Sequence, residues 1–348
     1  YKNNIKMNIK SIFYFFLAVS FMLFFNSCSN KTSKQNKKEI AKKVKYPSDV
    51  IPFMGKWKIL LGDGTRSENL IKFQKEDFFY VENDGTTDWV VYKTPNSGIT
   101  SRTSSNTRSE LGEKKHWIPE EGGKLTATLK VQHVSTTGDA TRASSYSVVI
   151  GQIHSDEGHE NEPLKIYYKK FPGHKKGSVF WNYEINTQGD NIGRFDYSTA
   201  VWGYDFSVVG KGTSDYPKEP ENGIALGKEF TYEVNVYKGI MYLTFKSEGH
   251  KTIKFTKSLI KSDFAKIEDI PEQVLKVYAN REKGGGVERE IAYAGEINYF
   301  KQGAYNQANA KSTKSEIYGG DIAKQYANGS YAEVWFKEAT VGKSTPPQ

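Results

Sequence analysis

Apolar side chains recur at every second position in segment after segment of this chain, and this alternation limits its fold more than any other feature. In residues 124–131, for example, Leu125, Leu129 and Val131 fall between lysine and threonine residues. A period of two is typical of a β-strand with one buried and one solvated face, whereas a helix would show a period near 3.6. The chain is therefore expected to fold mainly from strands.

The same pattern predicts where the strands lie. Residues 230–245 alternate on both sides of Lys238-Gly239, which indicates a hairpin. Further strands are expected at 57–61, 68–73, 77–81, 144–154, 164–169, 178–185, 251–256, 291–305 and 331–337, and helical patterns at 259–265 and 271–276. No regular exchange of strands and helices is present, so we predict an all-β fold of two antiparallel sheets, a sandwich or jelly roll. Loops that wall a binding cleft are expected at the long polar segments 155–163, 186–228 and 281–290.

Composition narrows the functional classes. The 348 residues carry 49 Lys and Arg against 40 Asp and Glu, and the formal charge of +9 makes a polyanion a plausible partner. A single cysteine excludes an internal disulfide framework and a cysteine-ligated zinc scaffold. Since no histidine or carboxylate cluster suggests a catalytic metal, we expect no cofactor, and we do not expect nucleic acid as a partner. A structural cation held by loop acids around Asp190 or Asp215 stays open.

The beginning of the chain predicts export. The first 27 residues hold three lysines, no acidic residue and an apolar run at 12–25 that is too short for an ordinary membrane span. The run ends in Phe-Phe-Asn-Ser-Cys-Ser, which places Cys28 where a bacterial lipoprotein signal carries its acylated cysteine; an ordinary secreted protein with an incidental cysteine is the alternative. We expect a signal peptide at 1–27, a lysine-rich tether at 28–45 and an extracytoplasmic, monomeric domain at 46–348, anchored to a membrane through a lipid on Cys28.

Two of the expected strands have an unusually polar face. In residues 107–113, a period of two places Arg108 and Glu110 on one surface and Leu111 on the other. In residues 299–307, one face carries Tyr299, Lys301, Tyr305 and Gln307, and the other carries Phe300, Gln302 and Ala304. Gly303 is expected to leave room for a group to approach the sheet.

A third strand carries a glutamine and a histidine. Gln152 and His154 share one face, and Ile153 points to the core. Strict alternation would place Val148 and Ile150 on the same face as Gln152, so this face is predicted to be only partly polar.

These three segments resemble the signature motifs of the polysaccharide lyase family 7 alginate lyases. The family motifs read approximately Arg-Ser/Thr-Glu-Leu-Arg, Gln-Ile/Val-His and Tyr-Phe-Lys-x-Gly-x-Tyr-Asn-Gln, and they occur here in the same order, with the likeness running from about Tyr46 to Val341. The resemblance implies a concanavalin-like β-jelly roll with a concave groove that binds alginate. Two positions depart from the motifs: Gly112 stands where the family has a second arginine, and Gln302 where a small apolar residue is common.

The resemblance also implies roles in a β-elimination that leaves an unsaturated uronate at the new non-reducing end. Arg108 and Gln152 would neutralise the uronate carboxylate, as a guanidinium and a neutral amide can. His154 would take the C5 proton of guluronate and Tyr305 would protonate the leaving oxygen, with Tyr305 serving both roles for mannuronate. Further substrate-binding residues would be Glu110, which is better suited to orient Arg108, and Tyr299, Lys301, Asn306 and Gln307. In this family the sequence Gln-Ile-His tends to accompany activity on guluronate or mixed blocks.

Other interpretations of these residues are compatible with the sequence. Arg108 with Glu110 is also compatible with an ordinary ion pair, and the other histidines, His116 among them, have no motif around them. A glycoside hydrolase would need two carboxylates across the scissile bond, and no strand carries such an alternation of acids. A non-catalytic alginate-binding or carbohydrate-binding jelly roll is the main alternative, although a binder needs neither His154 nor Tyr305. The sequence leaves open whether cleavage is internal or from chain ends.

Overall fold

The computed structural model describes residues 45–102, 104–156, 161–185, 195–269, 288–308 and 314–348. The predicted signal peptide, Cys28 and nearly all of the tether lie outside these residues, as does the helix predicted at 271–276. In the described part of the chain, no helix is both long and apolar enough to cross a membrane.

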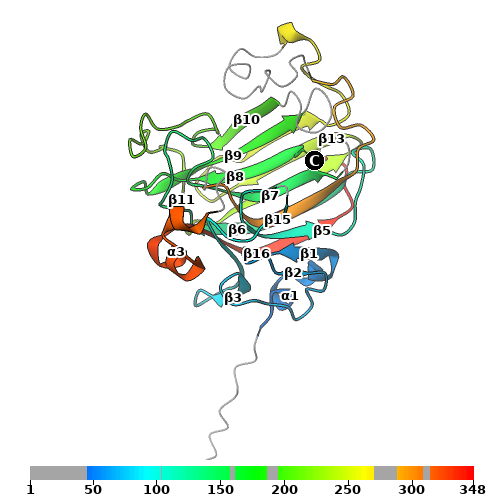
Figure 1. The fold of residues 1–348 in the computed structure, drawn as a ribbon. Helices are drawn as coiled ribbons and strands as arrows, with labels where there is room; N and C mark the ends of the chain where they lie inside the picture. The colour runs from blue at the N-terminus through cyan, green and yellow to red at the C-terminus, as the bar shows by residue number, and fades with distance from the viewer. Residues whose placement is uncertain (1–44, 103, 157–160, 186–194, 270–287, 309–313) are drawn as a thin grey trace, which may run out of the picture. The chain divides into compact units, whose positions relative to one another are not determined.

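Two antiparallel sheets make up the fold, and Figure 1 shows the strands of the larger sheet side by side. Among the described residues this sheet has nine strands in the order β10-β9-β8-β7-β15-β5-β1-β2, with β11 paired to β9. Their bounds are β1 Trp57–Leu60, β2 Arg66–Ser67, β5 Arg108–Glu113, β7 Ser147–Ser155, β8 Leu164–Lys169, β9 Lys176–Ile185, β10 Phe195–Trp202, β11 Ile224–Ala225 and β15 Asn298–Asn306.

The second sheet has seven described strands in the order β14-β13-β12-β6-β16-β4-β3. Their bounds are β3 Phe79–Asn83, β4 Asp88–Pro95, β6 Gly123–His133, β12 Phe230–Tyr237, β13 Ile240–Lys246, β14 Ile253–Ser258 and β16 Tyr331–Gly342. Short helices are α1 Pro47–Val50, η1 Pro52–Lys56, η2 Ile267–Asp269, η4 Ser315–Tyr318 and α3 Ile322–Asn328. The fold is the predicted all-β jelly roll.

One hydrophobic core lies between the sheets. The alternating residues Leu125 and Leu129 of β6 are fully buried in it, as the period of two predicts. Gln302 of β15 also points into this core, where its Nε2 donates a hydrogen bond to the Tyr232 hydroxyl at 2.8 Å. That hydroxyl donates in turn to the carbonyl of Ile150 at 3.1 Å. A polar chain thus joins the two sheets, because a buried amide needs partners.

The predicted hairpin at 230–245 is confirmed. Strands β12 and β13 pair from Thr231 and Lys246 to Tyr237 and Ile240. The two turn residues, Lys238 and Gly239, have φ values of 51° and 78°. A two-residue turn with both φ values positive matches the twist of antiparallel strands.

Two predicted strands are wrong in whole or in part. Residues 68–73 form no strand, because the Asn69 side chain accepts a hydrogen bond from the backbone N–H of Ile71 at 3.1 Å and turns the chain. The strand expected at 291–305 begins only at Asn298, since residues 289–294 are folded into turns.

The predictions of a helix at 259–265 and of a loop throughout 186–228 are also wrong. Residues 259–265 form no helix, because the Ser258 hydroxyl accepts the backbone N–H of Lys261 at 3.0 Å and offers the chain a local alternative. The polar segment 186–228 is not all loop, because it contains β10 and β11.

A β-bulge in β7 changes which side chains share the polar face. The pairing of β7 with β8 shifts register between Val149 and Gly151, so the alternation inverts there. Val148 and Ile150 therefore lie in the core, and the prediction that they share the face of Gln152 is wrong. The outer face of β7 is more polar near its end than strict alternation predicts.

Gly303 of β15 is closely packed against neighbouring strands and leaves no space for a ligand. Its φ is 143°, and a Cβ at this position would lie 2.5 Å from the carbonyl oxygen of Ser109 and 3.0 Å from the ring of Tyr92. The space that the sequence predicted for an approaching group is therefore taken by strand β5 and by the second sheet.

Candidate active site

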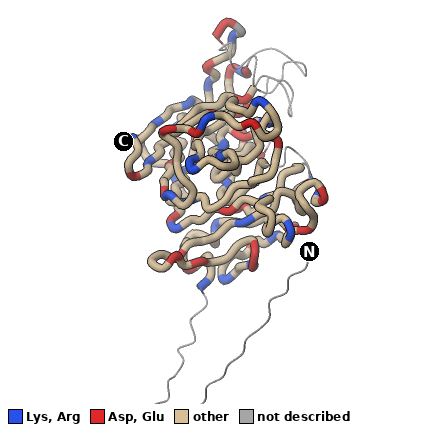
Figure 2. The backbone as a smooth tube through the Cα atoms, turned by 90° about the vertical axis from the view of Figure 1, so that its left-hand side faces the viewer, with Lys and Arg blue, Asp and Glu red and all other residues tan. Residues whose placement is uncertain are grey.

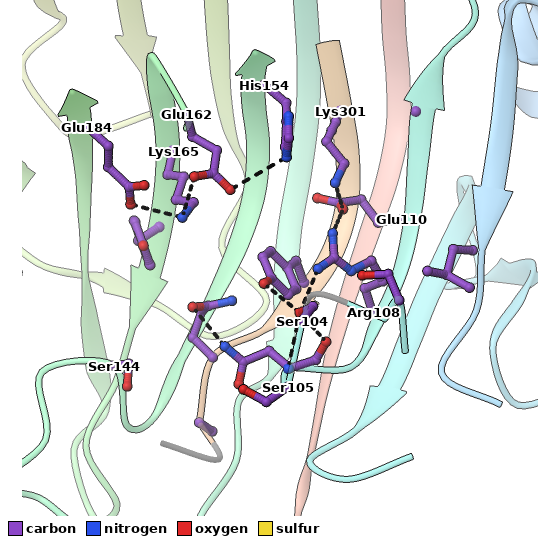
Figure 3. Close-up of a pocket in the computed structure, with 18 of the residues that line it drawn as sticks. Ser104, Ser105, Arg108, Glu110, Ser144, His154, Glu162, Lys165, Glu184 and Lys301 are labelled. Atoms are coloured by element: carbon purple, nitrogen blue, oxygen red, sulfur yellow. Dashed lines mark hydrogen bonds and ion pairs between the residues drawn. The ribbon is translucent and has the colours of Figure 1, made fainter. Parts of the chain in front are cut away.

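Strand pairing brings the three motif segments together at the centre of the nine-stranded sheet. Strand β15 lies between β5 and β7, and its register places Tyr299 opposite His154, Lys301 opposite Gln152, and Tyr305 opposite Arg108. Neighbouring strands are about 4.8 Å apart, so side chains on the same face touch across the strands. They line a cavity of about 1320 Å³ on the face of the sheet that is turned away from the core. Figure 3 shows side chains that line this cavity, with Arg108, Glu110, His154 and Lys301 among those labelled.

Glu110 of β5 is held by three neighbours. Its carboxylate accepts a hydrogen bond from Arg108 Nη1 at 3.2 Å and pairs with Lys301 Nζ at 2.9 Å. The amide Nε2 of Gln152 donates to its other oxygen. Burial would raise the pKa of Glu110, but the Lys301 and Arg108 charges outweigh burial and hold the pKa below its ordinary value. Glu110 is therefore ionised and fixes two cations and an amide in place.

Arg108 and Tyr305 form the second part of the site. The guanidinium carbon lies 3.7 Å from the centroid of the Tyr305 ring. Ser104 joins the two, because its hydroxyl accepts from Arg108 Nη2 at 3.0 Å and lies 3.1 Å from the Tyr305 hydroxyl. Burial would raise the pKa of Tyr305, but the cations Arg108 and Lys165, together with the Ser104 contact, lower that pKa below its ordinary value.

His154 of β7 presents one ring nitrogen to the cavity. Its Nδ1 lies 2.6 Å from the carbonyl oxygen of Ser155, and a carbonyl only accepts, so Nδ1 carries the proton. Nε2 is then the nitrogen with a free lone pair, and it lies 3.9 Å from a carboxylate oxygen of Glu162. Burial, reinforced by the positive charge of Lys301, lowers the pKa of His154 to about 3. The imidazole is therefore neutral at ordinary pH.

An ion-pair cluster lies beside His154. Lys165 of β8 pairs with Glu162 at 3.0 Å and with Glu184 of β9 at 2.9 Å. Burial would lower the pKa of Lys165, yet the two carboxylates raise it well above the ordinary value. Figure 3 shows these side chains on the same wall of the cavity as His154. Figure 2 shows that basic and acidic residues are interspersed along the backbone.

The predicted site residues do not all reach the cavity. Arg108, Glu110, His154, Tyr299, Lys301, Tyr305 and Gln307 line it. Gln152 is 1% exposed and lies beneath the floor, where it holds Glu110. Asn306 must be corrected: it is on the opposite face of β15 from Tyr305, its amide donates to Asn96 at 2.9 Å, and it is buried away from the cavity.

Sequence reasoning missed several residues of the site. Ser104 and Glu162 lie in loops, which have no periodicity to assign them to a face. His116, which has no motif around it, stacks on Tyr299 with ring centroids 4.8 Å apart and pairs with Asp156 at 3.0 Å. Lys165 could have been found from the sequence, because it lies within the strand predicted at 164–169. A lysine in a buried strand needs a charged partner, so its presence there indicates an ion pair.

The cavity can neutralise a carboxylate and transfer protons. Within the ranges that the structure describes, no three His, Cys, Asp or Glu side chains are grouped to hold a metal ion. A groove on a jelly-roll sheet that offers a guanidinium, a neutral imidazole and a phenol together is typical of a polysaccharide lyase, which acts on anionic sugar chains.

Comparison with known proteins identifies the family. A family model described as "Alginate lyase" matches residues 51–343. The crystal structure of the exolytic PL7 alginate lyase AlyA5 from Zobellia galactanivorans is 71% identical, covers 87% of this chain and 99% of that chain, and superposes with a TM-score of 0.83. The chain therefore belongs to the PL7 alginate lyase family and is an enzyme of the polysaccharide lyase class.

More distant proteins are also similar to this chain. An alginate lyase from Klebsiella pneumoniae is 28% identical over 269 residues, which are 68% of this chain and 73% of the relative. The crystal structure of the alginate lyase from Klebsiella pneumoniae has a TM-score of 0.61 at 24% identity and covers 86% of this chain and 99% of that chain. A family 7 alginate lyase crystallised with product (GGG) has a TM-score of 0.52 at 18% identity, covers 86% of this chain and 99% of that chain, and shares the fold.

Proposed function

We propose that this protein cleaves the 1,4-glycosidic bond of alginate by β-elimination and leaves an unsaturated uronate at the new non-reducing end. The observation that carries the proposal is the presence of Arg108, His154 and Tyr305 side by side in one cavity. In this reaction the C5–H bond breaks, its electron pair forms the C4=C5 double bond, and the C4–O bond breaks. The sugar ring loses one proton and the leaving oxygen gains one.

The first requirement is to neutralise the uronate carboxylate, because it resists the charge that develops as the C5 proton leaves. Arg108 supplies a fixed guanidinium, and Glu110 and Ser104 hold it in orientation. Gln152 contributes from beneath the floor of the cavity, where its amide N–H donates to Glu110, the carboxylate that orients Arg108. Donors that are already oriented stabilise this charge without reorganising.

The second requirement is a base and an acid on the two sides of the scissile bond. Nε2 of the neutral His154 accepts the C5 proton of guluronate, and the resulting imidazolium lies near the carboxylate of Glu162. The Tyr305 hydroxyl gives its proton to the leaving glycosidic oxygen. Its lowered pKa makes it a better acid than an ordinary phenol, and for mannuronate it also favours proton abstraction by Tyr305.

Family likeness supports a proposal for the preferred blocks and for the mode of cleavage. The sequence Gln152-Ile153-His154 supports a preference for guluronate or mixed blocks, and Ile153 itself is buried in the core, where it can only influence the strand. The 71% identity to a lyase described as exolytic supports release of products from chain ends.

One assay tests the proposed function. Purified polyguluronate, polymannuronate and mixed blocks are incubated with the protein while ultraviolet absorbance of the unsaturated product is followed, and the products are then sized. We expect absorbance to rise fastest with guluronate-containing blocks, with small products from the first minutes. New reducing ends without absorbance would indicate a hydrolase, and binding without either would indicate a carbohydrate-binding protein. Early products of intermediate length would contradict the exolytic mode.

A further inference from the structure

A row of side chains crosses the larger sheet at the level of Lys301. Strand pairing places Lys58 of β1 opposite Gly112, Gly112 opposite Lys301, and Lys301 opposite Gln152. Lys58 is therefore two strand spacings from Lys301, roughly 10 Å. Both lysines line the same cavity.

The absence of a side chain at Gly112 lets Lys58 lie over strand β5. A Cβ at Gly112 would be 3.6 Å from Cε and 3.7 Å from Cγ of Lys58, and 3.7 Å from the ring of Tyr299. The stem of Lys58 thus occupies the space above Gly112, which is where the family motif has its second arginine. The ammonium lies 6.0 Å from the centroid of the Tyr299 ring, and both residues line the cavity.

Lys58 and Lys301 differ in whether their ammonium groups are paired with a carboxylate. Lys301 is paired with Glu110, whereas the exposed Lys58 makes no ion pair with any residue that the structure describes. A cation without an internal partner, lying against an aromatic ring in an anion-binding groove, is available to an anionic ligand.

We propose that Lys58 binds the carboxylate of a uronate unit that lies over Tyr299 and Gly112, and that it replaces, from the neighbouring strand, the cation missing at position 112. This inference rests on the proposed function, because it requires a polyuronate in the cavity. Lys58 is too far along the row to touch the sugar held by Arg108 and Lys301, so it acts on binding of a neighbouring unit and not on proton transfer.

Steady-state kinetics of charge-relocation variants test the inference. Lys58→Ala is expected to raise KM for guluronate oligomers roughly three- to tenfold, with a much smaller change in kcat, since a charge-assisted contact at a partly exposed position is of moderate strength. Lys58→Arg should keep KM close to the wild-type value. The double variant Lys58→Ala with Gly112→Arg should recover most of the lost affinity, because Gly112 does not have a positive φ and Lys58→Ala clears the space next to it.

Salt and a matched lysine provide the controls. Lys211→Ala removes an exposed lysine outside the cavity and should leave KM unchanged. The KM of the wild type should rise more steeply with sodium chloride than that of Lys58→Ala. An unchanged KM in Lys58→Ala, or an equal rise in Lys211→Ala, would overturn the inference while wild-type lyase activity stands. A wild type that forms no unsaturated product would instead refute the proposed function.

Discussion

At the scale of single residues, Glu110 explains how a carboxylate can lie in a groove for an anionic polymer. Its charge is shared between Arg108 and Lys301, and Gln152 donates to its second oxygen. An acid without these partners would repel the substrate. With them, Glu110 fixes the direction of the guanidinium, which is the group that we propose meets the uronate. We therefore regard Glu110 as a positioning residue.

The two proton-transfer groups predict the pH dependence of activity. In the proposed mechanism His154 acts in its neutral form, and its pKa is lowered to about 3, so the base should stay active as pH falls well below the ordinary imidazole range. Tyr305 is proposed to act in its protonated form, and its pKa is lowered, so activity should be lost as pH rises through a value below that of an ordinary phenol. A profile of kcat/KM on polyguluronate, with circular dichroism confirming the fold at each pH, should show no acidic limb near pH 6.5 (about the ordinary imidazole pKa). An acidic limb at that pH would contradict the assignment.

At the scale of strands, sequence periodicity located most of the site. Alternation placed Arg108 with Glu110, and Lys301 with Tyr305, because β5 and β15 pair without an irregularity. It failed in β7, where the bulge after Val149 inverts the faces. An extra residue of this kind has no signature in a single sequence, since it depends on the partner strand.

Contacts made by loops were beyond sequence reasoning for a different reason. Ser104 lies next to Tyr305, and Glu162 next to His154, only because the tertiary structure brings the loops and strands together. Their positions depend on the path of segments without periodicity, and such contacts follow from the tertiary structure alone.

Gly303 of β15 gives a test at the scale of the strand. Gly303→Ala should destabilise the protein by about 2–4 kcal/mol, because the new methyl group would collide with the Ser109 carbonyl and the backbone conformation disfavours a side chain. Urea unfolding measures the change. Gly249 has a φ of 75° and open space around it, so Gly249→Ala adds backbone strain but no collision. This substitution should lower the free energy of unfolding by about 1 kcal/mol. Equal effects of the two substitutions would show that the close contact of β15 with β5 is unimportant.

At the scale of the whole molecule, composition and periodicity predicted the two-sheet architecture, and the strand order came from the structure. The Greek-key arrangement that places β15 between β5 and β7 joins segments more than a hundred residues apart in sequence. Export, acylation of Cys28 and the tether stay predictions from sequence, because nearly all of these residues lie outside those described, and the monomeric state likewise stays a prediction.

Replacing Tyr305 with phenylalanine tests the proposed proton transfer to the leaving oxygen. The measurement is kcat on polyguluronate together with the dissociation constant for guluronate oligomers by calorimetry. Tyr80→Phe, in a strand of the other sheet, serves as the control. Our account predicts that Tyr305→Phe lowers kcat by roughly 10²–10⁴-fold while oligomer binding stays within about threefold, because only the proton donor is lost. A Tyr305→Phe enzyme that binds normally and keeps kcat within tenfold of the wild type would contradict it.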